Sequence, residues 1–108
     1  MSDFKDFDVE VQNFRDSTPE QFNGTVTTAG SPNTITPTST KPITKAFIQN
    51  PSKGTNANSI LDVLYYSIDG TSYASLTRGE SITLPGIFNS ILIDTNNNNT
   101  NYEIIVWS

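Results

Sequence analysis

Acidic side chains are the groups in this chain that come closest to supporting chemistry, because the chain has 11 Asp and Glu residues but no histidine or cysteine. Asp6, Asp8 and Glu10 would lie on one face of a strand and, with Asp3, could offer oxygen ligands to a calcium ion. Their spacing differs from that of a compact calcium loop, and no glycine is present to allow its sharp turn. We therefore expect a solvated strand face, with no metal site and no cofactor.

Catalysis by the other acids is not expected. A glycoside hydrolase needs two carboxyl groups that converge on one bond. Five further acids are available, three of them in or beside expected turns: Asp62, Asp69, Glu80, Asp94 and Glu103. Serine and threonine are plentiful, but the chain lacks the histidine that usually activates them. The sequence therefore predicts a protein without catalytic residues, which is not an enzyme.

Aromatic side chains suggest a sugar-binding platform on a β-sandwich. The candidates are Tyr65, Tyr66, Tyr73, Tyr102 and Trp107. Four of the five lie in expected strands with strongly apolar neighbours, where packing in a core or an interface is the simpler interpretation. Carbohydrate binding is kept as an alternative function.

Length and charge narrow the class of protein. A chain of 108 residues fits one domain with its own core. The net charge of -5 argues against a nucleic-acid partner, since phosphate backbones attract clustered Lys and Arg. No apolar run approaches the length of a membrane span, and the acidic N-terminus differs from the basic start of a signal peptide. We expect a protein that is made in the cytoplasm and has no membrane partner.

The expected secondary structure consists of short strands and turns. The chain is organised around residues 60–84, which hold an apolar strand, a tight turn at Asp69-Gly70 and two further strands. Pro85-Gly86 should end the last of these. The expected strands are 21–29, 43–49, 60–68, 73–76, 81–84, 90–94 and 102–107.

The spacing of these strands predicts the fold class. Seven to nine short strands recur about every ten residues, with turn residues between them. The proline-rich residues 31–42 form a loop or an extended edge segment. The pattern predicts a single antiparallel β-sandwich at residues 21–108, of jelly-roll or immunoglobulin-like connectivity.

Residues 1–20 form an N-terminal arm or a first strand of the same sandwich. They carry six of the 11 acids, interrupted by regularly placed apolar residues. The apolar spacing fits either an amphipathic strand or a helical stripe, and the valines favour the strand. A docking arm would grip a neighbouring protein by strand addition. Its expected anchors are Phe4, Phe7, Val11 and Phe14.

Two expected strands are apolar on both faces. In residues 60–68 only Asp62 and Ser67 interrupt the apolar run, and in residues 102–107 only Glu103 does. A strand with one face in water should be polar at every second position. Such strands therefore lie in the middle of the fold or are covered by another chain. The expected interface residues on the covered face are Leu61, Val63 and Tyr65.

Residues 48–86 resemble a pattern found in small β-sandwich accessory proteins of tailed bacteriophage virions. The matching features are Asn50-Pro51 before an apolar strand, the Ser67–Gly70 turn, Tyr73, and Leu76–Ser81, which reads Leu-x-x-Gly-Glu-Ser. The closing Tyr102–Ile105 is also similar to the last strand of that family. The resemblance covers about the C-terminal sixty residues, and the first forty match no pattern.

This resemblance implies a structural protein of the virion. The expected function is a capsid decoration or cement subunit that docks on other virion proteins through its arm and its apolar strand faces. A neck or tail accessory protein remains an alternative. Many copies would each bury a modest interface, and multivalency would strengthen the attachment. We expect a homo-oligomer that is located in the virion.

Overall fold

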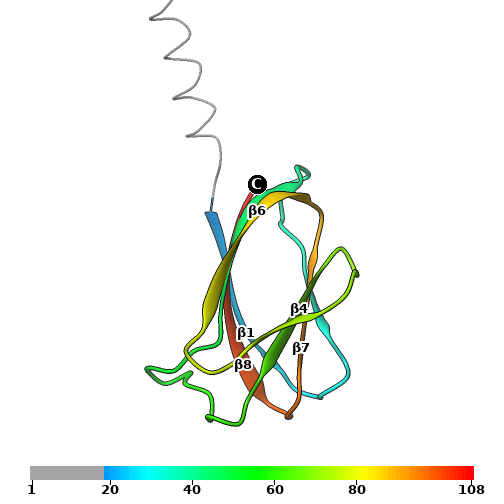
Figure 1. Cartoon of the computed structure of the whole chain (residues 1–108). Coiled ribbons are helices and arrows are strands. Elements are labelled where there is room, and N and C mark those ends of the chain that lie inside the picture. Colours follow the sequence, from blue (N-terminus) through cyan, green and yellow to red (C-terminus); the bar gives the residue numbers. More distant parts are fainter. Residues whose placement is uncertain (1–18) are drawn as a thin grey trace, which may run out of the picture.

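The computed structural model describes residues 19–108, which contain eight strands and no helix (Figure 1). The predicted arm anchors Phe4, Phe7, Val11 and Phe14 lie outside the described residues. The strands are β1 (Pro19–Val26), β2 (Asn33–Ile35), β3 (Ile43–Gln49), β4 (Leu64–Ile68), β5 (Ala74–Leu76), β6 (Ser81–Phe88), β7 (Ile91–Thr95) and β8 (Thr100–Trp107).

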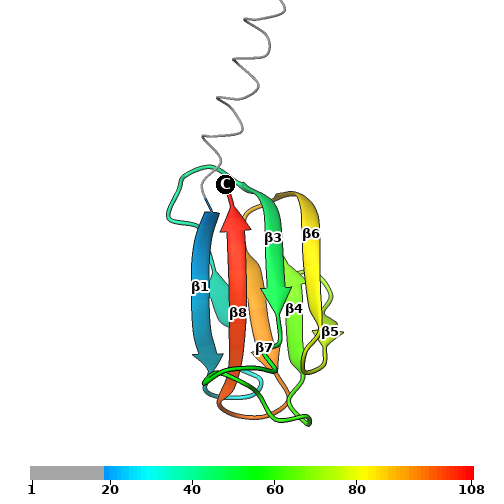
Figure 2. The same ribbon diagram turned by 90° about the vertical axis from the view of Figure 1, so that its left-hand side faces the viewer.

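The strands form two four-stranded antiparallel sheets. Sheet A has the order β1-β8-β3-β6, which Figure 2 shows face on, and sheet B has the order β2-β7-β4-β5. Four strand pairs are nested along the chain: β1 with β8, β2 with β7, β3 with β6, and β4 with β5. The chain is thus one long hairpin that is rolled up and joined by the β3–β8 and β4–β7 pairings. The predicted β-sandwich is confirmed, and its connectivity is that of a jelly roll.

The core lies between the two sheets and follows from the alternation of side chains along each strand. On β8 every second residue from Thr100 to Val106 is buried, while the residues between them are half-exposed. Burying each large aliphatic side chain contributes about 1.5–3 kcal/mol relative to leaving it in water. The largest fully buried apolar side chains are Val26, Ile43, Ile48, Leu64, Ile91, Ile93, Ile104 and Val106.

The predicted strand at residues 60–68 is wrong in its first four residues, because β4 begins at Leu64. Residues 59–62 instead close a turn. The Asp62 backbone N–H donates to the Ser59 carbonyl over 3.0 Å, and the Ser59 N–H donates to Asp62 Oδ2 over 2.8 Å. The apolar run at Ile60 and Leu61 therefore leaves the sheet instead of extending it.

Other strand boundaries also differ from expectation, most clearly that of β6. β6 runs through Pro85-Gly86, which the sequence predicted to be a break. A proline is tolerated there because β6 is the edge strand of sheet A and has one side free of ladder bonds. Within the proline-rich residues 31–42, residues 33–35 form β2 at the edge of sheet B. This agrees with the prediction that the region is a loop or an extended edge segment. β1 begins at Pro19, within the region expected to be the arm.

The predicted turn at Asp69-Gly70 is present. Both residues have positive φ, 52° and 76°, as a tight hairpin turn of the primed type requires. Asp69 Oδ1 also accepts hydrogen bonds from the backbone N–H groups of Asn89 and Ser90, each over 2.9 Å. This carboxylate therefore ties the β4–β5 turn to the β6–β7 turn.

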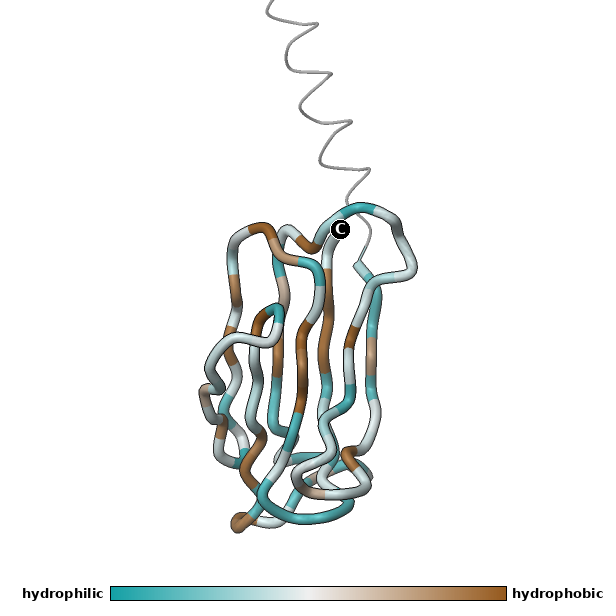
Figure 3. Tube along the Cα trace, turned by 90° about the vertical axis from the view of Figure 1, so that its right-hand side faces the viewer, coloured by the Kyte–Doolittle hydropathy of each residue, from teal (hydrophilic) through white to brown (hydrophobic). Residues whose placement is uncertain are grey.

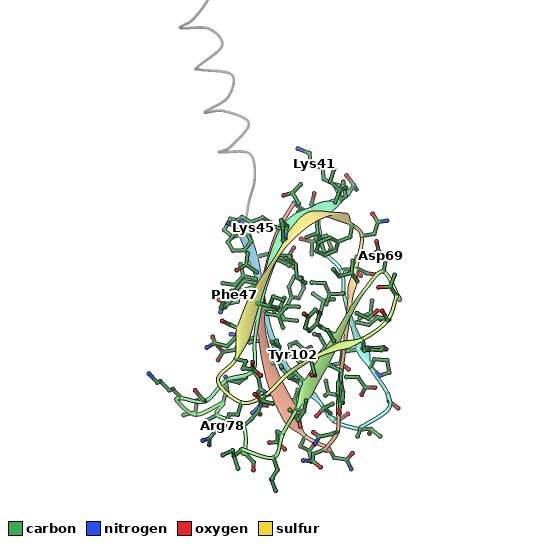
Figure 4. The ribbon with its side chains drawn as sticks, viewed as in Figure 1. Lys41, Lys45, Phe47, Asp69, Arg78 and Tyr102 are labelled. Atoms are coloured by element: carbon green, nitrogen blue, oxygen red, sulfur yellow. The ribbon has the colours of Figure 1, made fainter. Side chains whose placement is uncertain are left out.

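Gly24 on β1 is required by the close approach of Tyr102 on β8, its direct partner in the ladder. A Cβ at position 24 would lie within 2.5 Å of the tyrosine hydroxyl oxygen. The same hydroxyl accepts a hydrogen bond from Asn33 Nδ2 over 3.2 Å, which links β8 to β2 in the other sheet. In Figure 4 Tyr102 points between the sheets.

We predict that Gly24→Ala lowers the free energy of unfolding by about 1–3 kcal/mol, because the new methyl group displaces a buried ring. Urea denaturation measures the effect. Tyr102→Phe removes the closest atom, so the double variant should lose less than the sum of the two single losses. If the double variant instead loses the sum of the two single losses, the predicted clash between a methyl group at position 24 and the Tyr102 hydroxyl is contradicted.

Candidate functional site

The loop between β3 and β4, residues 50–63, carries the two most prominent aliphatic side chains at one end of the sandwich. Ile60 is 71% exposed and Leu61 is 72% exposed. The hydrophobic colouring at the lower tip of the molecule in Figure 3 marks this region. We call this pair the apolar tip. Two adjacent exposed aliphatic side chains offer apolar area that a partner can bury, so the tip is a candidate contact point.

A fully buried side chain, Asn50, holds the base of this loop. Its Nδ2 atom donates to the carbonyl of Leu76 over 2.9 Å and to the carbonyl of Asp62 over 3.0 Å. Its backbone N–H donates to the Glu80 carbonyl, and its own carbonyl accepts from the Gly79 N–H. Asn50 therefore joins the loop to the β5–β6 turn on both its backbone and its side chain.

Asn58 completes the same buried network. Its Nδ2 atom donates to Asn50 Oδ1 and to the carbonyl of Asn101, both over 2.7 Å. Its Oδ1 atom accepts from the Asn101 N–H over 2.8 Å, at the start of β8. Within residues 19–108 every buried side-chain polar atom has a hydrogen-bond partner. The loop is thus fixed by satisfied polar groups and not by an apolar core of its own.

The asparagine run of residues 96–99 holds the outer part of the loop. Asn96 Oδ1 accepts from the Val63 N–H over 2.8 Å, and its Nδ2 donates to the Leu61 carbonyl over 2.9 Å. Asn97 Nδ2 donates to Asp62 Oδ1 over 3.0 Å. Asn96 and Asn97 therefore bond to the β3–β4 loop and fix the apolar tip.

The structure separates the three predicted interface residues that it describes. Leu61 belongs to the apolar tip, Val63 follows it in the loop, and only Tyr65 lies on a strand. Tyr65 is half-exposed on the outer face of sheet B, opposite Asp94 of β7. The three therefore do not share one strand face.

A second apolar surface lies on the outer face of sheet A. Phe47 of β3 is the direct neighbour of Ile105 of β8, and Trp107 follows two residues along. All three side chains are half-exposed. Figure 4 shows Phe47 and Lys45 projecting from this face. We call these three residues the β3–β8 stripe. The sequence signal for it was the run apolar on both faces at residues 102–107. Trp107 is also one of the aromatic residues that the sequence offers for sugar binding, whereas Phe47 and Ile105 carried no prediction.

A shallow hollow of about 300 Å³ lies at the Glu103 end of the same face. Its lining is mainly polar and combines the end of β3, the β3–β4 loop, the β5–β6 turn and β8: Gln49, Pro51, Ser52, Lys53, Gly79 and Glu103. It offers one carboxylate and one ammonium group beside amide and hydroxyl groups. These groups hydrogen-bond polar ligands, and they show no nucleophile paired with a base.

No group of three acidic, histidine or cysteine side chains in residues 19–108 is placed to hold a metal ion. That part of the chain also has no helix able to cross a membrane. The whole sequence matches no protein-family model and no curated protein.

We predict that Asn58→Ala lowers the free energy of unfolding by at least about 2 kcal/mol, because it removes the side-chain partner of Asn50 Oδ1 and of the Asn101 N–H and carbonyl. Chemical denaturation measures the loss. Asn56→Ala is the matched control, since only the backbone carbonyl of Asn56 takes part in the network. Equal losses in the two variants would contradict the role given to Asn58.

Glu80 provides a pH-dependent test of the β5–β6 turn. Hydrogen bonds from the hydroxyl and the backbone N–H of Thr77 hold the pKa of Glu80 below its ordinary value. A lowered pKa contributes stability above the ordinary glutamate range, and this contribution is lost as the pH falls through the folded-state pKa. An NMR titration of the Glu80 carboxyl carbon should show the lowered pKa. Thr77→Val should raise it towards the ordinary value, and an unchanged pKa would contradict the assignment.

Proposed function

We propose that this protein is a non-enzymatic structural subunit of a bacteriophage particle, most directly a capsid decoration or cement subunit, with a neck or tail accessory protein as the variant of the same role. The observation that carries the proposal is the apolar tip. A loop held by buried asparagines keeps two adjacent aliphatic side chains, Ile60 and Leu61, more than 70% exposed, where a partner can bury them.

The two proposed docking elements, the N-terminal residues and the apolar tip, are attached to the sandwich at opposite ends of sheet A, which fits a linking role. Residues 1–18 join the sandwich at Pro19, which pairs with Trp107 at one end of sheet A. The apolar tip follows β3 beyond Gln49, at the other end, where Glu103 lies. A protein that bridges neighbouring subunits needs contacts at separated points, and multivalent attachment then multiplies weak individual contacts.

The fold supports the proposal by analogy alone. Jelly rolls occur in viral capsid proteins and also in lectins, and one fold serves many functions. The resemblance of residues 48–86 to virion accessory proteins favours the first of these uses.

Carbohydrate binding is the second candidate function, and the hollow beside the β3–β8 stripe favours it. Sugars pack on aromatic faces and bond to carboxylate and amide groups. Phe47 lies two residues from Gln49 on the strand that borders the hollow. A screen against oligosaccharides tests this candidate, with Phe47→Ala and Glu103→Gln expected to abolish any binding at this site.

The virion proposal predicts that the chain is part of the particle. Particles from cells that carry the gene should contain the chain at stoichiometric levels by mass spectrometry, and a chaotrope should release it. Purified full-length chain should then rebind to stripped particles, while a variant lacking residues 1–18 or carrying Ile60→Ser and Leu61→Ser should bind at least about tenfold more weakly.

Ile87→Ser is the matched control for this experiment. Ile87 is 80% exposed on β6, away from the loop that carries the apolar tip, so its loss should leave rebinding unchanged. Circular dichroism should show that all variants keep the fold. Particles that lack the chain, or tip variants that rebind like the parent, would contradict the proposal.

A further inference from the structure

The β3–β8 stripe has a charge at each end. Along β8 the outward-facing residues are Glu103, Ile105 and Trp107, and their direct neighbours on β3 are Gln49, Phe47 and Lys45. The Lys45 Nζ atom lies over the Trp107 ring, 4.3 Å from its centroid. One end of the stripe is therefore positive, the middle is apolar, and the other end is negative. The charged ends are separated by four residues, or about 13 Å along the strand.

We propose that this face of sheet A is a two-fold interface with a second copy of this chain. A symmetric interface requires a surface that is complementary to itself, so that residue i of one copy meets residue j of the other and the reverse. The proposed two-fold axis lies in the plane between the two facing sheets and runs perpendicular to the strands, at the level of Phe47 and Ile105. This axis places β8 of one copy against β8 of the other, and β3 against β3. The facing strands then run in opposite directions.

This arrangement places unlike charges together and apolar groups together. Phe47 and Ile105 meet their own counterparts at the axis. Because the Lys45 ammonium lies over Trp107, its charge is centred on β8, and there it faces Glu103 of the second copy. The two resulting ion pairs oppose the repulsion between two chains of net charge -5.

The size of the face is sufficient for a specific contact. Four strands about 4.8 Å apart and eight residues long present a flat area of about 500 Å². Two such faces bury about 1,000 Å² in total, which is the lower bound of specific interfaces. Aromatic residues at the centre of a contact supply much of its affinity. This inference concerns a surface separate from the apolar tip and does not depend on the virion role.

Charge reversal tests the proposal. The mass of the full-length chain is measured by sedimentation velocity over a concentration series, for the native protein, Lys45→Glu, Glu103→Lys and the double variant. The native chain should form a dimer. Each single variant sets like charges against each other and should weaken the dimer on the order of tenfold or more, while the double variant should restore it. Lys41→Glu, which makes the same charge change off this face, should have no effect.

A cross-linking experiment tests where the two-fold axis lies along the strands. The chain contains no cysteine, so Ile105→Cys introduces a single thiol next to the axis. The backbones of two facing sheets lie about 10 Å apart, which is too far for a disulfide but within reach of a bismaleimide with a short spacer. This reagent should join two copies of Ile105→Cys, whereas Gln49→Cys, displaced from its counterpart by about 13 Å along the strand, should not cross-link.

A native chain that stays monomeric at all concentrations overturns the proposal, as does a double variant that fails to recover the dimer. Ile105→Cys that the bismaleimide does not join into a covalent dimer excludes the stated axis and therefore also overturns the proposal. The Ile60→Ser and Leu61→Ser variant should remain dimeric, so a failure of the virion role leaves this result unchanged.

Discussion

The buried amide of Asn50 is the interaction on which one whole end of the sandwich depends. It bonds to the β3–β4 loop at Asp62, to β5 at Leu76 and to Asn58, which continues to β8. A buried amide without partners costs free energy, so the loop is stable only in the conformation that satisfies every one of these bonds. That conformation is the one that holds Ile60 and Leu61 in water.

The molecule therefore positions its apolar surfaces by two different means. The β3–β8 stripe is exposed because strand alternation turns every second residue of β8 away from the core. The apolar tip is exposed because polar bonds pull the chain out of the sheet before β4. Hydrogen bonds hold both surfaces, those of the sheet ladder in the stripe and those of the asparagines at the tip. A preorganised contact loses little conformational entropy when it binds a partner, which suits a protein whose proposed role is attachment.

The sequence predicted the parts of this fold that depend on local pattern. The recurrence of short strands about every ten residues, with turn residues such as Asp69-Gly70 between them, was sufficient to predict a sandwich. The features that it missed depend on contacts between distant residues. Residues 60–63 have a strand-like pattern, but bonds from Asn96 and Asn97 hold them in a loop. The run at residues 102–107 was recognised as apolar on both faces, yet only the pairing of β8 with β3 shows that its outer side joins Phe47 in one stripe.

Amide hydrogen exchange of the native full-length chain tests most directly the claim that the β3–β4 loop is a fixed frame. The N–H of Asn58 donates to the Pro51 carbonyl, and the N–H of Asn101 donates to Asn58 Oδ1. If the network fixes the loop, both amides exchange as slowly as those of Ile104 and Val106 in the core of β8. Exchange of the Asn58 amide at the rate of an exposed loop, while β8 stays protected, would contradict the account.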